Sequence, residues 1–173
     1  MIFKIMGSLI VLLSSCFLGY ILSSDCKKRP QQLRELQALL QMFENQITYL
    51  SDILTEAFER IYRSSKNEVG IFFIDTVEKL KNGKSMNASC AWEAAIRENI
   101  KRTALNREDE EILVSFGRIL GSSDLEGQVK NIKLALSQLR LQEQKAEENR
   151  SKNEGMYKSL GILGGMAVVI VLI

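Results

Sequence analysis

Few residues in this chain could do chemistry, and the first candidate is an acidic run. Residues 108–111 are four consecutive acids, and carboxylates are the groups that bind hard metal cations. Consecutive residues of a helix point around its whole circumference, so these four do not converge on one ion. Acids in a first helical turn are already favoured by the helix dipole. We therefore expect the start of a helix here, with a cation site as the alternative.

Catalytic groups are otherwise scarce. The sequence has no histidine, which removes the commonest general base and the commonest metal ligand together. Its three cysteines, Cys16, Cys26 and Cys90, form no CxxC pair, so they predict neither a zinc cluster nor a disulfide framework. No GxxxxGK[ST], GxSxG or HExxH pattern occurs either. We expect no enzyme activity, no cofactor, no metal and no small-molecule substrate.

Glycines near the C-terminus form a more informative motif. Gly161 and Gly165 have the small-xxx-small spacing that lets two membrane helices approach closely, and Gly164 adjoins them. The partner could be the first apolar segment or a different protein. We take these three glycines as candidates for packing between membrane helices. The alternative is a glycine-rich membrane helix without a close partner.

Two uncharged ends predict that these glycines lie in a membrane. Residues 5–22 carry no charge and would form a helix of about 27 Å, close to the bilayer core of about 30 Å. Residues 159–173 give only about 22 Å, but Tyr157 and Lys158 favour the membrane interface and can extend the span. We predict transmembrane helices over residues 5–22 and 157–173, with lipid as a partner.

A lipoprotein is the alternative for the first segment. Residues 13–16, Leu-Ser-Ser-Cys, have the form of a lipoprotein processing site. The chain stays apolar after Cys16 as far as Leu22, where a mature lipoprotein would turn polar. The length of the apolar segment therefore favours a membrane span.

Basic residues flank the apolar ends on their inner sides. Residues 27–29 follow the first segment, and Arg150, Lys152 and Lys158 precede the second, whereas only Lys4 lies beyond. The positive-inside rule then places the middle of the chain in the cytoplasm and both termini outside. Without Lys4, the 23 basic residues become 22 against 21 acids, so we expect no nucleic-acid partner.

Apolar residues at helical spacing predict that the middle of the chain is all-α. Pro30 suits a first helical turn, and a seam at alternating spacings of three and four residues follows it. The seam consists of Leu33, Leu36, Leu40, Phe43, Ile47, Leu50 and Leu54. A break near residues 52–55 would divide this run into two helices. Intramolecular bundle packing is favoured over a coiled-coil oligomer, because the seam is short.

Further helices follow with recognisable ends. We expect one over residues 69–81, where the alternative of a strand at residues 71–74 has no partner strand, and Gly83 would end it. Another is capped by Ser85 or Asn87 and contains Trp92 as a core residue. A third runs from residue 107 to 120, begins at an Asn106–Asp109 cap and ends at Gly121.

The last helix is predicted to be long. It opens with a capping box at residues 123–126 and buries a seam as far as Leu139. From Gln142 to Glu154 the only apolar residue is Ala146, so we expect a solvated stalk with no face to bury. The predicted organisation is an extracytoplasmic tail (1–4), a transmembrane helix (5–22), a cytoplasmic helical bundle (23–141), a polar helical stalk (142–156) and a second transmembrane helix (157–173).

The order of several motifs resembles one family nearly end to end. RPQQL begins at Arg29, FG-x-x-LG-x-SD-x-x-x-Q spans residues 116–128, and MYKSLG begins at Met156. This combination is similar to the stage III sporulation protein AB family of endospore-forming bacteria. The motif residues that carry the resemblance are Pro30, Leu36, Gly83, Trp92, Phe116, Gly117, Gly121, Asp124 and Gln128.

The resemblance implies a function. That family is similar to the helical domains of the inner-membrane platform proteins of type II secretion and type IV pilus machines. It implies a scaffold subunit of the channel between mother cell and forespore, located in the mother-cell-derived outer forespore membrane. Its partners would be other stage III sporulation channel proteins, including the cytoplasmic ATPase. Since this chain has one helical domain and two short spans, the platform's transport mechanism does not carry over. A two-span sensor or a lipoprotein with an extracytoplasmic bundle is the alternative.

Overall fold

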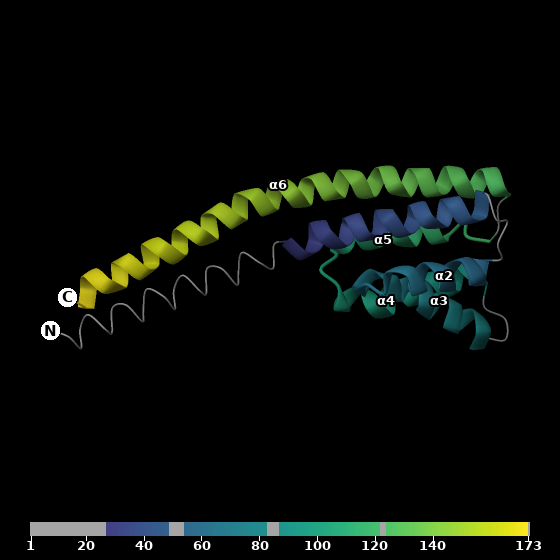
Figure 1. Ribbon diagram of the computed structural model, residues 1–173, viewed down its shortest axis with the longest axis horizontal. Helices are drawn as coiled ribbons and strands as arrows, with labels where there is room; N and C mark the ends of the chain where they lie inside the picture. The colour runs from purple at the N-terminus through teal and green to yellow at the C-terminus, as the bar shows by residue number, and fades with distance from the viewer. Residues whose placement is uncertain (1–26, 49–53, 83–86, 122–123, 173) are drawn as a thin grey trace. The chain divides into compact units, whose positions relative to one another are not determined.

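The computed structural model describes residues 27–48, 54–82, 87–121 and 124–172. Its elements within these ranges are helical, which confirms the all-α prediction (Figure 1). After a first helix over residues 27–48 come α2 (Leu54–Ser65), η1 (Glu68–Gly70), α3 (Ile71–Asn82), α4 (Ala88–Asn99), η2 (Ile100–Arg102), α5 (Arg107–Gly117) and α6 (Leu125–Leu172). The chain divides into two compact units, Gln31–Gln144 and Met1–Pro30 with Lys145–Ile173.

The first helix and α6 run antiparallel within the unit Gln31–Gln144 (Figure 1). Arg34 pairs with Glu143 at 2.6 Å, and ten residues later Glu44 lies 3.7 Å from Lys133. Residue numbers therefore rise along one helix while they fall along the other. The buried residues of the two helices are Leu33, Leu36, Leu39, Leu40, Phe43 and Ile47 on the first, and Ile132, Ala135, Leu136 and Leu139 on α6. The predicted seam is thus confirmed from Leu33 to Ile47, whereas Leu50 lies outside the described residues.

Five aromatic rings form the centre of the core. One ring comes from each of the first helix, α2, α3, α4 and α5, namely Phe43, Phe58, Phe73, Trp92 and Phe116. Their ring centroids lie 4.9 to 6.4 Å apart, mostly in edge-to-face or tilted geometry. Such pairs contribute about 0.5–1.5 kcal/mol each beyond the burial of their area. The five rings thus join five separate helices in one core.

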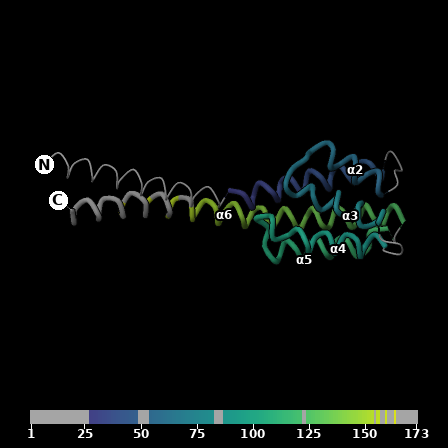
Figure 2. The backbone as a smooth tube through the Cα atoms, turned by 90° about the horizontal axis from the view of Figure 1, so that it is seen from below, coloured from purple at the N-terminus to yellow at the C-terminus, as the bar shows by residue number. Residues whose placement is uncertain are grey.

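The apolar run in residues 71–74 is helical, as expected. Phe72 and Phe73 are both fully buried, since α3 packs on α2 and on α4. Figure 2 shows α4 next to α5, in agreement with the contacts between these two helices. Asn87 is the cap of α4, because its side chain accepts a hydrogen bond from the backbone N–H of Cys90 at 2.8 Å.

Two predicted helix ends need correction. The first helix is already helical at Lys27, so it does not begin at Pro30. The α5 helix ends at Gly117 and not at Leu120, because the N–H of Leu120 bonds to the carbonyl of Gly117 at 3.1 Å and tightens the chain into a turn. Gly121 does adopt the left-handed conformation expected of a stop, with φ of +75°.

The polar part of α6 also differs from its prediction. Gln142 and Ala146 are buried, with 8% and 4% of their surface exposed, so the stretch after Leu141 does have a face to bury. The expectation gave no weight to a single alanine or to polar residues, but Ala146 is buried, and Gln142 is buried with its amide donating a hydrogen bond to Glu108 at 2.8 Å.

Membrane spanning was predicted for both ends of the chain. Among the described residues, no helix combines the length and the apolar character needed to cross a bilayer. The predicted tail (1–4) and first span (5–22) lie outside the described residues, as does Ile173.

Candidate functional site

The acidic run begins α5. The side chain of Asn106 accepts from the N–H of Asp109 at 3.0 Å, and Asp109 accepts from the N–H of Asn106 at 2.9 Å. This reciprocal capping box confirms the predicted Asn106–Asp109 cap and explains why Asp109 is fully buried. Within the four ranges that the structure describes, no cluster of three or more potential ligand side chains could hold a metal ion.

Three motif residues meet where α4 packs on α5. Trp92 is fully buried and donates its indole N–H to the carbonyl of Leu113 at 2.7 Å. The ring of Phe116 lies 5.4 Å from that of Trp92. Gly117 lies against the same indole, and a Cβ at this position would come within 2.2 Å of Trp92 Cδ1. The glycine is therefore required by the close approach of the indole.

Other described residues of the FG-x-x-LG-x-SD motif lie after the end of α5 and before the start of α6. A Cβ on Gly121 would lie 3.2 Å from that of Ala88, and the positive φ disfavours other residues as well. Asn131 donates to the carbonyl of Phe116 at 2.8 Å, which satisfies the end of α5. Asp124 accepts from the N–H of Gly127 at 2.9 Å and caps α6. The cap is thus at Asp124, and Ser123 of the predicted box lies outside the described residues.

The other predicted site residues belong to the first helix, to α6 or to ranges outside the described residues. Leu36 is fully buried in the core, and Gln128 is half-buried on α6. Pro30 is buried and belongs to the other unit. Gly83 lies outside the described residues, and so do the surroundings of Gly161, Gly164 and Gly165, whose backbone belongs to α6. Within the unit Gln31–Gln144, the contacts described above for Trp92, Phe116, Gly117, Gly121 and Asp124 pack or cap helices.

Gln32 is a structural residue that the sequence patterns missed. It is 4% exposed, and its side-chain amide donates to Glu68 at 2.5 Å. Its carbonyl oxygen accepts from the backbone N–H of Ala104 at 2.7 Å. One amide thus connects the first helix with η1 and with the segment after η2. The sequence feature that could have identified Gln32 is its position four residues before Leu36, which puts both side chains on one face of the helix.

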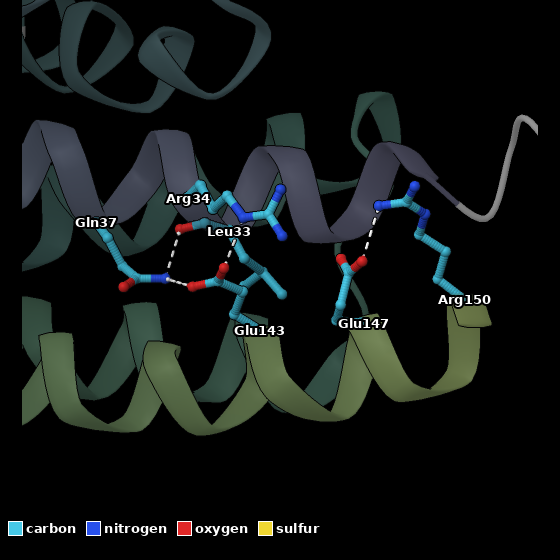
Figure 3. Close-up of polar contacts among 6 residues, drawn as sticks. All are labelled: Leu33, Arg34, Gln37, Glu143, Glu147 and Arg150. Carbon is cyan, nitrogen blue, oxygen red and sulfur yellow. Dashed lines mark hydrogen bonds and ion pairs between the residues drawn. The ribbon is translucent and has the colours of Figure 1, made fainter. Parts of the chain in front are cut away.

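Glu143 is a second missed residue, and it joins the first helix to α6 (Figure 3). One carboxylate oxygen accepts from Arg34 Nε at 2.6 Å, and the other accepts from Gln37 Nε2 at 2.8 Å. Burial alone raises the pKa of Glu143, but the hydrogen bonds from Gln37 and Arg34 and the charges of Arg34 and Arg140 outweigh it and lower the pKa. In the other unit, Arg150 donates to Glu147 at 2.8 Å (Figure 3).

Grooves on the unit Gln31–Gln144 lie between pairs of helices. The groove between α4 and α5 has a volume of about 400 Å³ and is lined by Arg97, Arg107, Glu110, Glu111, Val114 and Arg118. Arg97 pairs with Glu93 at 2.7 Å and Arg107 with Glu111 at 3.2 Å, each along its own helix. Its charges are mixed, which favours no ligand of one sign.

The second groove lies between the first helix and α6 and has a volume of about 420 Å³. It is lined by Gln41, Glu44, Lys133, Leu136, Ser137, Arg140 and Leu141. Leu141 is 57% exposed at its edge, and Leu134 on the same helix is equally exposed. Leu141 thus gives the edge of this groove an exposed apolar side chain, although single exposed leucines are common on protein surfaces.

Comparison with known proteins agrees with the sequence motifs. The family model described as stage III sporulation protein AB matches residues 4–173. The chain is 33% identical to stage III sporulation protein AB of Bacillus subtilis (strain 168) over 169 residues, which covers 98% of each chain. A solved structure of stage III sporulation protein AB is similar with a TM-score of 0.67 and 33% identity, covering 72% of this chain and 98% of that one.

Proposed function

Because this chain belongs to the stage III sporulation protein AB family, we propose that it is a non-enzymatic membrane scaffold of the channel complex between mother cell and forespore. The observation that carries this proposal is the use of the family's most specific motif. Within residues 116–128, Gly117 contacts Trp92 at the end of α5 and Asp124 caps α6. A motif used to hold helices in place suits a part that positions other proteins.

Membrane anchoring is part of the proposal. Residues 5–22 and 157–173 would span the outer forespore membrane, which derives from the mother cell. Residues 23–141 would form the cytoplasmic bundle and residues 142–156 the stalk, with the tail (1–4) outside. Basic residues on the inner flanks support this orientation. The glycines Gly161, Gly164 and Gly165 would pack against other membrane helices.

The cytoplasmic bundle would present its surface to other channel proteins, among them the secretion-type ATPase, stage III sporulation protein AA. The similarity of the family to secretion platform proteins supports this partner. A two-span sensor or a lipoprotein would instead carry its bundle outside the cytoplasm.

The native Cys90 offers a direct test of orientation, since it is exposed on α4. We would replace Cys16 and Cys26 with serine and treat protoplasts of cells expressing the protein with a membrane-impermeant maleimide. The proposal expects labelling of Cys90 only after the membrane is permeabilised. A matched variant that also has Cys90→Ser and Ile2→Cys should label in intact protoplasts.

Labelling of Cys90 in intact protoplasts would exclude a cytoplasmic bundle and favour the sensor or lipoprotein. The ATPase partnership needs its own measurement, which is co-purification of the ATPase with the full-length, detergent-solubilised protein. Absence of the ATPase from a preparation that retains the other channel proteins would contradict that part of the proposal.

A further inference from the structure

Two exposed leucines on α6 are aligned along the helix. Leu134 and Leu141 are each 57% exposed, while Leu136 and Leu139 between them are buried. A separation of seven residues is close to two helical turns, so the two exposed side chains lie almost in line. Single exposed leucines are common on protein surfaces, and the polar Ser137 and Gln138 lie between these two on the same side of α6. The leucines are therefore two aligned apolar contact points about two helical turns apart.

The groove next to Leu141 can receive a side chain. It lies between the first helix and α6, has a volume of about 420 Å³ and includes Leu136 and Ser137. Since Leu136 is only 6% exposed, the apolar part of the groove is recessed, whereas Leu141 at its edge is exposed and Leu134 follows along the same helix. An elongated partner along α6 could therefore make contact at the leucines and insert one residue into the groove.

The exposed charges near the two leucines are mainly basic. Lys130, Lys133 and Arg140 are exposed on α6 near the two leucines. Glu44 lies in the groove, 3.7 Å from Lys133, and its side chain is only 17% exposed against 67% for the lysine. Glu143 accepts hydrogen bonds from Arg34 and Gln37, and the charge of Arg140 also acts on it. A partner at this surface therefore meets more positive than negative charge.

The sign of this charge discriminates between occupants. A second copy of the chain, docked face to face, would bring Lys130, Lys133 and Arg140 of both copies together, which is unfavourable. An acidic partner would pair with the same three residues. The two aligned leucines and the groove suit the apolar face of an amphipathic helix, which presents apolar residues at spacings of three, four and seven.

We propose that the α6 leucine face, defined as Lys130, Lys133, Leu134, Arg140 and Leu141 with the adjoining groove, binds an acidic amphipathic helix of a partner protein. Apolar residues of that helix contact the two leucines and fill the groove. Its acidic residues pair with the basic residues on either side. The inference deepens the proposed scaffold function and rests on it, since a scaffold acts by binding partners.

The experiment is photo-crosslinking in sporulating cells with the full-length protein. Benzoylphenylalanine would replace Ser137 or Leu141, and a control position would be Arg63 on α2, whose side chain is 78% exposed. At positions 137 and 141 we expect adducts with a partner segment that is acidic and has apolar residues at helical spacing. At the control position 63 we expect no such adduct.

A charge reversal makes the result specific. The triple variant Lys130→Glu, Lys133→Glu and Arg140→Glu should lower the adduct yield at 141 at least tenfold. Acid-to-lysine changes in the captured segment should restore it. Adducts with a second copy of this chain or with lipid, or a yield no higher than at 63, would overturn the proposal.

Failure of this inference can be told apart from failure of the proposed function. Labelling of Cys90 reports the orientation of the bundle and does not depend on the α6 leucine face. If Cys90 labels only after permeabilisation and the crosslinks are absent, the scaffold proposal stands and the proposed docking surface is wrong. If Cys90 labels in intact protoplasts, the scaffold proposal itself is wrong.

Discussion

Gly117 on α5 and Trp92 on α4 are in such close contact that no Cβ fits between them, since it would lie 2.2 Å from Trp92 Cδ1. The indole is held by its hydrogen bond to the carbonyl of Leu113, on the same helix as Gly117, and by its packing against Phe73 on α3. It therefore cannot move away from a larger residue. The contact sets the distance between two helices that carry the family motif.

Replacement of Gly117 with alanine should destabilise the protein by about 1–3 kcal/mol, because it overpacks a rigid core contact. The measurement is equilibrium unfolding of the full-length protein followed by circular dichroism. Gly155→Ala in α6 is the matched control, since nothing lies within 4 Å of a Cβ there. The control should be neutral or stabilise by up to about 1 kcal/mol, as alanine favours helix. Equal stability of Gly117→Ala and the wild type would contradict the packing.

Replacement of Gln32 with leucine should cost about 1–3 kcal/mol, because it removes both hydrogen bonds to Glu68 and Ala104 and leaves the N–H of Ala104 without its acceptor. The free energy of unfolding by urea is the quantity to measure. Gln31→Leu provides the comparison, since Gln31 is exposed and bonds only along its own helix to Glu35. It should change stability by less than about 0.5 kcal/mol. Similar losses for both variants would show that the amide of Gln32 has no special role.

The carboxylate of Glu143 should make stability depend on pH. Its pKa is lower in the folded chain than its usual 4.5, so its contribution is complete above the unfolded pKa and is lost as pH falls through the folded pKa. Glu143→Gln should thus reduce stability near neutral pH, by less than about 1 kcal/mol because the carboxylate is partly exposed. The difference from wild type should shrink below about pH 4.5. Unfolding free energies at several pH values would measure it, and a difference that grows on acidification would refute the explanation.

Truncation of Phe116 to alanine should cost about 3–5 kcal/mol, since its ring is 2% exposed and packs against Phe43 and Trp92. Thermal unfolding would report the loss. Leu134→Ala removes a side chain that is 57% exposed, so it should change stability by less than about 0.5 kcal/mol. A thermal midpoint of Phe116→Ala equal to that of Leu134→Ala would contradict a core role for the ring.

Leucine at both Gly161 and Gly165 should weaken assembly with other channel proteins without unfolding the bundle, because the added bulk prevents close approach of membrane helices. Co-purification yield from sporulating cells is the readout, and we expect a loss of several-fold. Met166→Leu changes the same apolar segment without adding bulk to the glycine face, so it should assemble normally. Unchanged co-purification of the double variant would argue for a glycine-rich helix without a close partner.

Much of the fold was predictable because its signals act over a few residues. The seam from Leu33 to Ile47 repeats with the period of one helix, and its burial follows from that period. The caps at Asn87 and Asn106 depend on side chains that reach backbone groups three residues away. The motif of the candidate site was also visible in the sequence, although its structural purpose was not.

The sequence by itself determined the all-α class, most helix boundaries and the family, since period, caps and motif order are local or linear properties. Only the tertiary structure decided that Gly117 must accommodate Trp92 and that Gln32 joins three segments. It also decided that Glu143 binds Arg34, although the two residues lie near opposite ends of the unit in the sequence. These contacts join residues that are 25 to 109 positions apart. They arise from which helices pack together, and no local pattern encodes that choice.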